Sequence, residues 1–315
     1  MARFSHLATQ PARGPGDILR WKVLDRLPGR RVSRGPEFAE LDRVRPGVRA
    51  GGAAAMASAG GAAACWIGHA SWVLRLGGKN VALDPIWSDR IQGVVPRLVE
   101  PGVAFEALPA LDVVCVTHDH MDHMDLPTLA RLGRGPTYIV PLGNRGRLAR
   151  LGLDDIVELD WWQSHPVGDL RVTLVPARHW SMRAPWSRNE TLWGGYVLRG
   201  PEGTAYHSGD TAAGEHFAEI AARMGEIDWA MLPIGSYAPR WFMEPQHMDP
   251  DDAGAAYLAL GVRNLLAMHW GTFRLTDEPI GEPPLRMRRW WVEHGLPDER
   301  LWIMDVGEVR DLVRS

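Results

Sequence analysis

The stretch VVCVTHDHMDHMD, residues 113–125, places three histidines and three aspartates within eight positions directly after an apolar run. The apolar run predicts a buried strand. Side chains two positions apart on a strand point the same way, so His118 and His120 can face one site. Asp122 and His123 follow as the chain turns toward the next helix. The resulting pattern H-x-H-x-D-H predicts a metal site.

Residue types that bind metals also follow other apolar runs of this sequence. These runs end at His179, at Asp210 and at His269. Strand ends meet at one edge of a sheet and can present their side chains to a shared cleft. A single catalytic zinc usually takes three protein ligands and a water, so this many candidates favour two ions. We therefore predict seven metal ligands: His118, His120, Asp122, His123, His179, Asp210 and His269.

The neighbouring polar residues are expected to play smaller parts. Asp119 alternates away from the two flanking histidines, and Asp125 is well placed to cap the following helix, so both are expected to serve the backbone or solvent. His69, in the word GHAS, is expected to support the site from behind or to be structural. Three arginines could bind a phosphate group, although solvation at the surface is the simpler interpretation of each: Arg178, Arg183 and Arg188.

The composition is that of an ordinary globular protein with 315 residues, 45% of them hydrophobic, and a net charge of -3. A run of about 18 apolar residues, as a membrane span requires, is not found. With only two cysteines and no secretion signal, we expect a cytoplasmic protein. The first fifty residues contain eleven Lys and Arg against five Asp and Glu, which leaves open a peripheral contact with an anionic membrane at its inner face. A homodimer is also left open.

The chain divides into two parts by its local character. For residues 1–63 we predict a basic arm and a flexible Gly/Ala linker, partly disordered or packed on the main domain. For residues 64–315 we predict a catalytic domain. The main domain opens with two strands around the turn Gly77-Gly78. Four helices are expected at residues 126–132, 217–224, 250–260 with Asp249 as N-cap, and 284–294.

Several long words of the sequence carry a resemblance to a known family. They include WIGHASWVL, HDHMDHMDLPTL, VPARHWSMR, LPIGSYAPRWFMEPQHMDPDDA and MHWGTFRLTDEP, in order between about residues 64 and 280. The motif resembles the metallo-β-lactamase superfamily, and the longer words resemble its zinc phosphodiesterases related to N-acylphosphatidylethanolamine-hydrolysing phospholipase D. The resemblance implies an α/β fold of the α+β kind, an αββα sandwich of two mixed β-sheets flanked by helices.

The resemblance also implies how the ligands divide and what they do. His118, His120 and His179 would hold one zinc, while Asp122, His123 and His269 would hold the second, with Asp210 bridging both. It implies hydrolysis of a phosphodiester, with a phospholipid such as N-acylphosphatidylethanolamine or another phosphodiester as substrate, by a metal-activated hydroxide. The catalytic residues would be Asp122, Asp210 and His247, the last contacting phosphate or donating a proton to the leaving oxygen.

The residues alone leave alternatives open. The motif is shared with lactonases, thioesterases and ribonucleases, so it does not select the bond that is cut. Nucleic acid is disfavoured, because the net charge is negative and no basic, aromatic-rich segment follows residue 50. His and Asp ligands suit zinc and also iron or manganese. A non-catalytic metal-binding module is the remaining alternative. Five tryptophans near the ligands in sequence suit an apolar groove leading to the metals: Trp180, Trp186, Trp193, Trp241 and Trp270.

Overall fold

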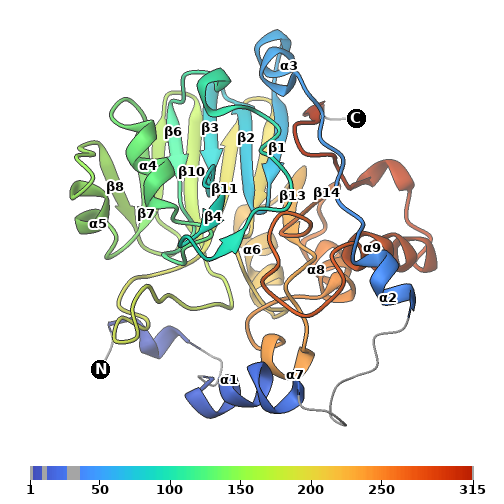
Figure 1. Ribbon diagram of the computed structural model, residues 1–315. Coiled ribbons are helices and arrows are strands. Elements are labelled where there is room, and N and C mark those ends of the chain that lie inside the picture. The colour runs from blue at the N-terminus through green and yellow to red at the C-terminus, as the bar shows by residue number, and fades with distance from the viewer. Residues whose placement is uncertain (1–2, 9–12, 27–35, 314–315) are drawn as a thin grey trace.

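The computed structural model describes residues 3–8, 13–26 and 36–313. Within these residues, two seven-stranded β-sheets pack face to face, and helices cover their outer faces (Figure 1). Each sheet contains both parallel and antiparallel strand pairs. The αββα sandwich with two mixed sheets is therefore confirmed.

Apart from β16, the first sheet comes from the earlier part of the chain and the second from the later part. The first contains β1 (Ala63–Gly68), β2 (Ser71–Leu76), β3 (Lys79–Leu83), β6 (Val113–Cys115), β7 (Thr137–Pro141), β8 (Ile156–Leu159) and β16 (Val309–Asp311), in the order β16-β1-β2-β3-β6-β7-β8. The second contains β9 (Ser164–Val167), β10 (Leu170–Val175), β11 (Gly195–Gly200), β12 (Gly203–His207), β13 (Trp229–Pro233), β14 (Asn264–Met268) and β15 (Leu301–Trp302), in the order β15-β14-β13-β12-β11-β10-β9. β4 (Arg90–Ile91) and β5 (Val95–Pro96) form a separate ribbon.

The alternation of side chains along the central strand β6 explains why both of its faces are apolar. Val113 and Cys115 point into the main core between the sheets, whereas Val114 joins a second apolar cluster on the outer face. Successive residues of a strand face opposite sides, so a strand covered on both sides needs a continuous apolar run. This is the run that precedes the histidine-rich loop.

The helices close the outer faces of the sandwich. Leu129 of α4 (Leu126–Leu132) and Leu148 of α5 (Arg145–Ala149) pack on the first sheet. The main core includes Phe217 of α6 (His216–Met224), Tyr257 of α8 (Pro250–Leu260) and Trp291 of α9 (Glu282–Glu293), and Figure 1 shows these three helices on the other side of the sandwich. The four predicted helices are confirmed to within two residues at each end. Shorter helical turns are α7 (Arg240–Met243), η3 (Phe105–Ala107) and η4 (Asp298–Arg300).

Two local predictions are confirmed by the backbone. Gly77 and Gly78 both have positive φ, 59° and 68°, as the two-residue turn between β2 and β3 requires. Asp249 caps α8, because its carboxylate accepts hydrogen bonds from the backbone N–H groups of Asp251 and Asp252.

The strand directions bring several strand ends to one edge of the sandwich. β3 and β6 run parallel in the first sheet. In the second sheet β12, β13 and β14 run parallel, and β10 runs the same way because it and β12 are both antiparallel to β11. The segments that follow β6, β10, β12 and β14 are those that contain the predicted ligands. The order of strands, rather than proximity in sequence, therefore assembles the site.

The segment expected to be a flexible Gly/Ala linker is ordered in part. Residues Gly52–Ser58 form α3, and Met56 within it is 1% exposed and packs against β1 and Val103. Alanine is the best helix former, and one buried methionine secures the helix to the domain. This helix is packed on the main domain, one of the two states expected for the segment, rather than being flexible. The division into an arm of residues 1–63 and a catalytic domain stays a prediction, since part of the arm lies outside the described residues.

The described residues before α3 run along the domain. They form η1 (Ser5–Leu7), α1 (Pro15–Lys22), η2 (Leu24–Arg26) and α2 (Pro36–Leu41). Trp21 of α1 packs on Phe242 of α7 with ring centroids 4.7 Å apart, and the two helices lie together in Figure 1. Val48 pairs with Val306 in an isolated bridge. In the described part of the chain, no helix has the length and apolarity needed to cross a membrane.

Candidate metal centre

Three histidines converge at the edge where the two sheets meet. His118 Nε2 lies 2.9 Å from His120 Nδ1, and His179 Nε2 lies 3.1 Å from the same nitrogen. The first two follow β6 in the first sheet, and His179 follows β10 in the second. Each nitrogen of a neutral imidazole either donates or accepts one hydrogen bond. The central nitrogen, His120 Nδ1, can therefore form a hydrogen bond with only one of its two neighbours. A shared cation would satisfy them together.

A second group of ligands lies beside the first. His123 Nε2 is 3.2 Å from Asp210 Oδ2 and 3.6 Å from Asp122 Oδ2. His269 Nε2 is 3.1 Å from Asp210 Oδ1 and 3.8 Å from Asp122 Oδ2. Potential ligand atoms of Asp210 lie within 4.8 Å of those of His118 and His123, and also within 4.8 Å of those of His179. Asp210 therefore stands between the two groups, and the structure brings all seven predicted ligands together.

The hydrogen bonding of these residues fits a metal site. Among the described residues, several buried ligand atoms make no hydrogen bond: His123 Nε2, Asp210 Oδ1 and His269 Nε2. Buried polar atoms are rarely left without a partner, because each one costs about 1–3 kcal/mol. Nitrogen and oxygen donors at these distances suit a divalent cation, which would remove that cost. The residues present therefore fit one or two metal ions, whose identity stays open.

The electrostatics of the site differ between its two halves. Burial lowers the pKa of His118 well below its usual value, that of His120 to about 4 and that of His179 to about 3, so these rings are neutral. Burial also acts on His123 and His269, but nearby Asp210 and Asp122 outweigh it; they raise the pKa of His123 well above its usual value and that of His269 to about 9. Positive charge is thus favoured beside the carboxylates, and a metal cation can supply it in place of protons.

Asp84 supports the site and was missed by the sequence analysis. It follows β3, is fully buried, and accepts three hydrogen bonds of 2.7 Å, from the backbone N–H and hydroxyl of Thr117 and from His123 Nδ1. A carboxylate on Nδ1 leaves His123 Nε2 free to bind a metal, as is usual for metal-binding histidines. The signal available in the sequence was a buried Asp directly after an apolar strand, in the word LDP.

His69 and His247 flank the predicted ligands. His69 Nε2 lies 3.0 Å from Asp122 Oδ2, and its ring centroid is 4.0 Å from that of His269. His247 Nδ1 lies 3.9 Å from Asp210 Oδ2, and its ring centroid is 5.2 Å from that of His179. Burial lowers the pKa of both to about 3, so both are neutral. A ring nitrogen of His69 lies within 4.8 Å of ligand atoms of Asp122, His123 and His269, so its supporting place stays a prediction. His247 faces the ligands directly.

Strained backbone also gathers at this edge. His69, Asp84 and His269 have positive φ values of 54°, 41° and 63°, in a region that residues other than glycine seldom adopt. Such conformations cost free energy and often occur at functional sites, where surrounding contacts hold them. Here each strained residue lies directly after a strand whose end is fixed by the sheet.

The comparisons with known proteins bear on this geometry. Residues 79–270 match the family described as "Beta-lactamase superfamily domain". The chain belongs to this superfamily. It is 44% identical over 237 residues to the uncharacterized protein Rv0906 of Mycobacterium tuberculosis, a match that covers 71% of this chain and 63% of the relative. The chain therefore spans less than two thirds of the length of that relative.

Two other relatives in the superfamily have descriptive names. The N-acyl-phosphatidylethanolamine-hydrolyzing phospholipase D 1 of Caenorhabditis elegans is 31% identical over 80% of this chain and 76% of its own length. A UPF0173 metal-dependent hydrolase of Nitratidesulfovibrio vulgaris is 30% identical over 79% of this chain and 95% of its own length. The chain thus groups with metal-dependent hydrolases. The solved structure of Igni18, a metallo hydrolase from Ignicoccus hospitalis, shares the fold with a TM-score of 0.62 and 21% identity, covering 79% of this chain and 97% of its own.

Several expectations about residues around this superfamily site need correction. Asp119 is fully buried rather than solvent-facing, and its carboxylate is paired with Arg147 at 3.1 Å. Asp125 stands at the N-cap of α4, yet its side chain accepts hydrogen bonds from the hydroxyls of Ser88 and Thr128 instead of from the helix backbone. Arg183 is not a purely solvated residue, because it donates hydrogen bonds to the backbone carbonyls of Asp119 and Met124. Both lie in residues 118–125, the metal-binding loop.

Two more arginines and the tryptophans also differ from expectation. Arg178 donates to the carbonyl of Ala213, and Arg188 stacks on Trp180. Trp180 meets the ring of His120 at 4.6 Å and can line an approach to the site. The other four tryptophans do not form one groove: Trp193 and Trp270 belong to the buried core, Trp241 packs beside Phe242, and Trp186 is 82% exposed.

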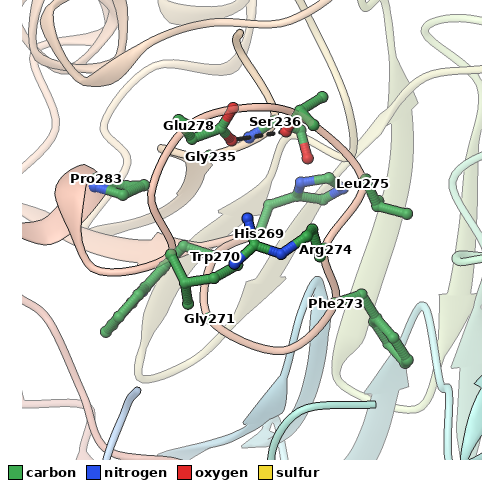
Figure 2. A pocket seen from close by; sticks show the side chains of 12 residues that line it. Gly235, Ser236, His269, Trp270, Gly271, Phe273, Arg274, Leu275, Glu278 and Pro283 are labelled. Carbon is green, nitrogen blue, oxygen red and sulfur yellow. Dashed lines mark hydrogen bonds between the residues drawn. The ribbon is translucent and has the colours of Figure 1, made fainter. Parts of the chain in front are cut away.

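A small cavity adjoins the second group of ligands. Figure 2 shows His269 with Ser236 and Glu278 among the side chains that line it. Its volume of about 10 Å³ is close to the room that one water molecule needs. Glu278 accepts hydrogen bonds from the backbone N–H groups of Ser236, at 2.6 Å, and Ala238, at 3.0 Å. The cavity is too small for a substrate, so we assign it to the support of the His269 loop.

Proposed function

We propose that the protein is a metal-dependent hydrolase that cleaves phosphodiester bonds of phospholipids in the manner of a phospholipase D, with N-acylphosphatidylethanolamine-like lipids as substrates. The observation that carries the proposal is the convergence of seven His and Asp side chains from both sheets, five of them buried, with Asp210 between two ligand groups. The likeness to the worm phospholipase D supports the choice of a phosphodiester.

The ligand set supports a site for two ions. His118, His120 and His179 would hold one ion, and Asp122, His123 and His269 the other, with Asp210 shared. Zinc is the proposed metal, and the same donors would accept iron or manganese. When bound, such ions lower the pKa of a coordinated water and neutralise charge on a phosphate oxygen. No serine or cysteine nucleophile is then required.

The residues of the chain have distinct tasks in this proposal. Burial alone would raise the pKa values of Asp122 and Asp210, but the neighbouring histidines outweigh it and hold both values well below the usual range, so both carboxylates stay ionised. These carboxylates would orient the attacking water and accept its hydrogen bond. Asp84 would hold His123 with Nε2 facing the site.

His247 has the position of a contact to the substrate phosphate. Its Nδ1 is buried and makes no hydrogen bond among the described residues. With a pKa lowered to about 3 by burial, the ring is neutral at pH 7. A neutral ring can donate one hydrogen bond to a phosphate oxygen, but it holds no extra proton for the leaving group. Of its two expected roles, we therefore favour phosphate contact.

The decisive experiment compares metal content with turnover of four bond types. A lipid phosphodiester, a soluble phosphodiester, a lactone and a thioester are assayed side by side with wild type and Asp210→Asn, and bound metal is measured by elemental analysis. We expect turnover of diesters by wild type with two metal ions per chain, and a large loss in the variant. Turnover of lactone or thioester alone would replace the proposal by another hydrolase of the superfamily. One metal ion per chain with no hydrolysis would indicate a binding module.

Contact with an anionic membrane is part of this proposal. Ile18 and Leu19 of α1 and Val23 at its C-cap are about half exposed, at 49%, 53% and 48%, while Trp21 anchors the helix to α7. Apolar side chains beside basic residues suit the surface of an anionic bilayer. Ile18→Asp combined with Leu19→Asp should reduce sedimentation with anionic vesicles and leave hydrolysis of a soluble diester unchanged. Unchanged sedimentation would contradict this contact.

A further inference from the structure

A second cavity lies on the outer side of the metal-binding loop. It has a volume of about 300 Å³ and opens to solvent between α5 and the turn around Ser187. Three guanidinium groups line it, against one carboxylate, that of Glu190: those of Arg147, Arg150 and Arg183. The volume is far larger than one water needs and falls at the small end of ligand sites.

Two of these arginines are fixed to the metal-binding loop. Arg147 pairs with the carboxylate of Asp119, which lies between His118 and His120 in the chain. Arg183 Nη1 donates to the carbonyl oxygens of Asp119, at 3.0 Å, and Met124, at 2.9 Å. The guanidinium groups of Arg147 and Arg183 therefore bind the metal-binding loop through Asp119 and Met124, not through its ligand side chains. Anything that binds these groups acts on residues that hold metal ligands in place.

The positive charge around the cavity is only partly compensated. Burial, followed by the proximity of Arg147, lowers the pKa of Arg183, which shows that the two cations repel each other. Arg150 is exposed, and its guanidinium has no hydrogen bond or ion pair among the residues that the structure describes. Asp119 compensates one charge from the inner side. A further anion entering from solvent would reduce the repulsion that remains.

We propose that this cavity binds a phosphate-type oxyanion, held by Arg150 and by the free faces of Arg147 and Arg183, and that the bound anion stiffens the metal-binding loop through Asp119. Guanidinium groups bind planar or tetrahedral oxyanions with paired hydrogen bonds, which matches a cluster of three. The exposed indole of Trp186 on the rim suits an oxyanion carried at a lipid surface as well as a free one. The shared chemistry is the phosphate group.

The test measures binding of inorganic phosphate to the metal-loaded protein by titration calorimetry. Four proteins are compared: wild type, Arg150→Ala, Arg150→Lys and the control Arg134→Ala. Arg134 does not line the cavity and pairs with Asp154. The side chain of Arg150 makes no internal hydrogen bond or ion pair among the described residues, so its truncation should leave the fold intact. We expect Arg150→Ala to weaken phosphate binding about tenfold, as loss of one charge-assisted contact does, with Arg150→Lys between it and wild type. Equal affinity in wild type and Arg150→Ala would overturn the proposal.

Two further arms separate the source of the anion and the effect on the loop. Phosphatidylcholine vesicles with and without phosphatidate show whether the phosphate is that of a lipid headgroup. A difference in vesicle binding that depends on Arg150 favours the lipid, and no such difference, with inorganic phosphate bound, favours the free ion. Hydrogen exchange of amides 119–125 should slow on adding phosphate in wild type and not in Arg150→Ala. Equal slowing in both would refute the coupling. Phosphate bound at the metals contributes equally to all four proteins, and the result does not depend on whether diesters are hydrolysed.

Discussion

Replacing Asp84 with asparagine tests whether this buried carboxylate determines how His123 faces the metal site. The substitution keeps the shape of the side chain, and asparagine tolerates the positive φ of 41° at this position. It changes one carboxylate oxygen into an NH₂ group. In the wild type Oδ1 accepts from the N–H of Thr117, and Oδ2 accepts from the Thr117 hydroxyl and from His123 Nδ1.

Either orientation of the amide leaves a conflict. With NH₂ toward His123, two donors face each other unless the ring moves its proton to Nε2, which removes the nitrogen that would bind metal. With NH₂ toward Thr117, the backbone N–H loses its acceptor. A buried donor without a partner costs about 1–3 kcal/mol, and loss of such a supporting carboxylate typically lowers metal affinity roughly 10- to 100-fold.

Two measurements check this reasoning. Urea unfolding of the metal-free protein should show the loss of stability, and competition with a chelator should show the loss of metal affinity. Asp112→Asn is the matched control, because Asp112 also accepts from a backbone N–H, that of Asn80, but lies at a partly exposed position and pairs with Lys79. The control should keep the wild-type metal affinity. If Asp84→Asn binds metal as tightly as the control does, the proposed role of Asp84 is wrong.

Three further outcomes are expected. Removing metal with a chelator should abolish hydrolysis, and adding back a divalent ion should restore it; activity that survives complete metal removal would contradict the proposed function. His216 is neutral in the fold, because burial and then Arg178 lower its pKa to about 4, below the usual 6.5. The unfolded chain then binds more protons between these pH values, so stability should rise with pH there. His216→Gln should reduce the loss of unfolding free energy between pH 7 and pH 4 by about 3 kcal/mol, as measured by urea titrations. Gly254→Ala should destabilise the protein by about 1–3 kcal/mol in the same assay, because a Cβ at this position of α8 would lie 2.4 Å from the ring of Trp290; an unchanged midpoint would show that α8 and α9 separate easily.

Features that depend on local pattern could be predicted from the sequence. The apolar run before His118 marks β6, the cap Asp249 marks the start of α8, and ligand types at strand ends mark the edge where the site forms. The seven candidate ligands do meet, because parallel strands end at the same edge. Their assignment to particular ions stays a prediction.

Features that depend on contacts distant in the sequence could not be predicted in this way. Asp84 reaches Thr117 and His123 across 33 and 39 residues, so its place after an apolar strand does not indicate which residues it supports. Gly/Ala composition indicated a linker where α3 forms, since the one buried side chain that holds it, Met56, is a long-range contact. Trp270 follows a ligand directly but packs on Trp66 in the core, because neighbouring positions at a strand end can face opposite sides.

The ligand groups draw on both sheets, since His118 follows a strand of the first and His179 a strand of the second. A bound ion would therefore cross-link the two halves of the sandwich, and its binding energy would count toward folding. An ion at a hundred times its dissociation constant adds about 2.7 kcal/mol to stability. Under metal starvation, the protein would lose both activity and resistance to proteolysis, so its abundance in the cell would follow the metal supply.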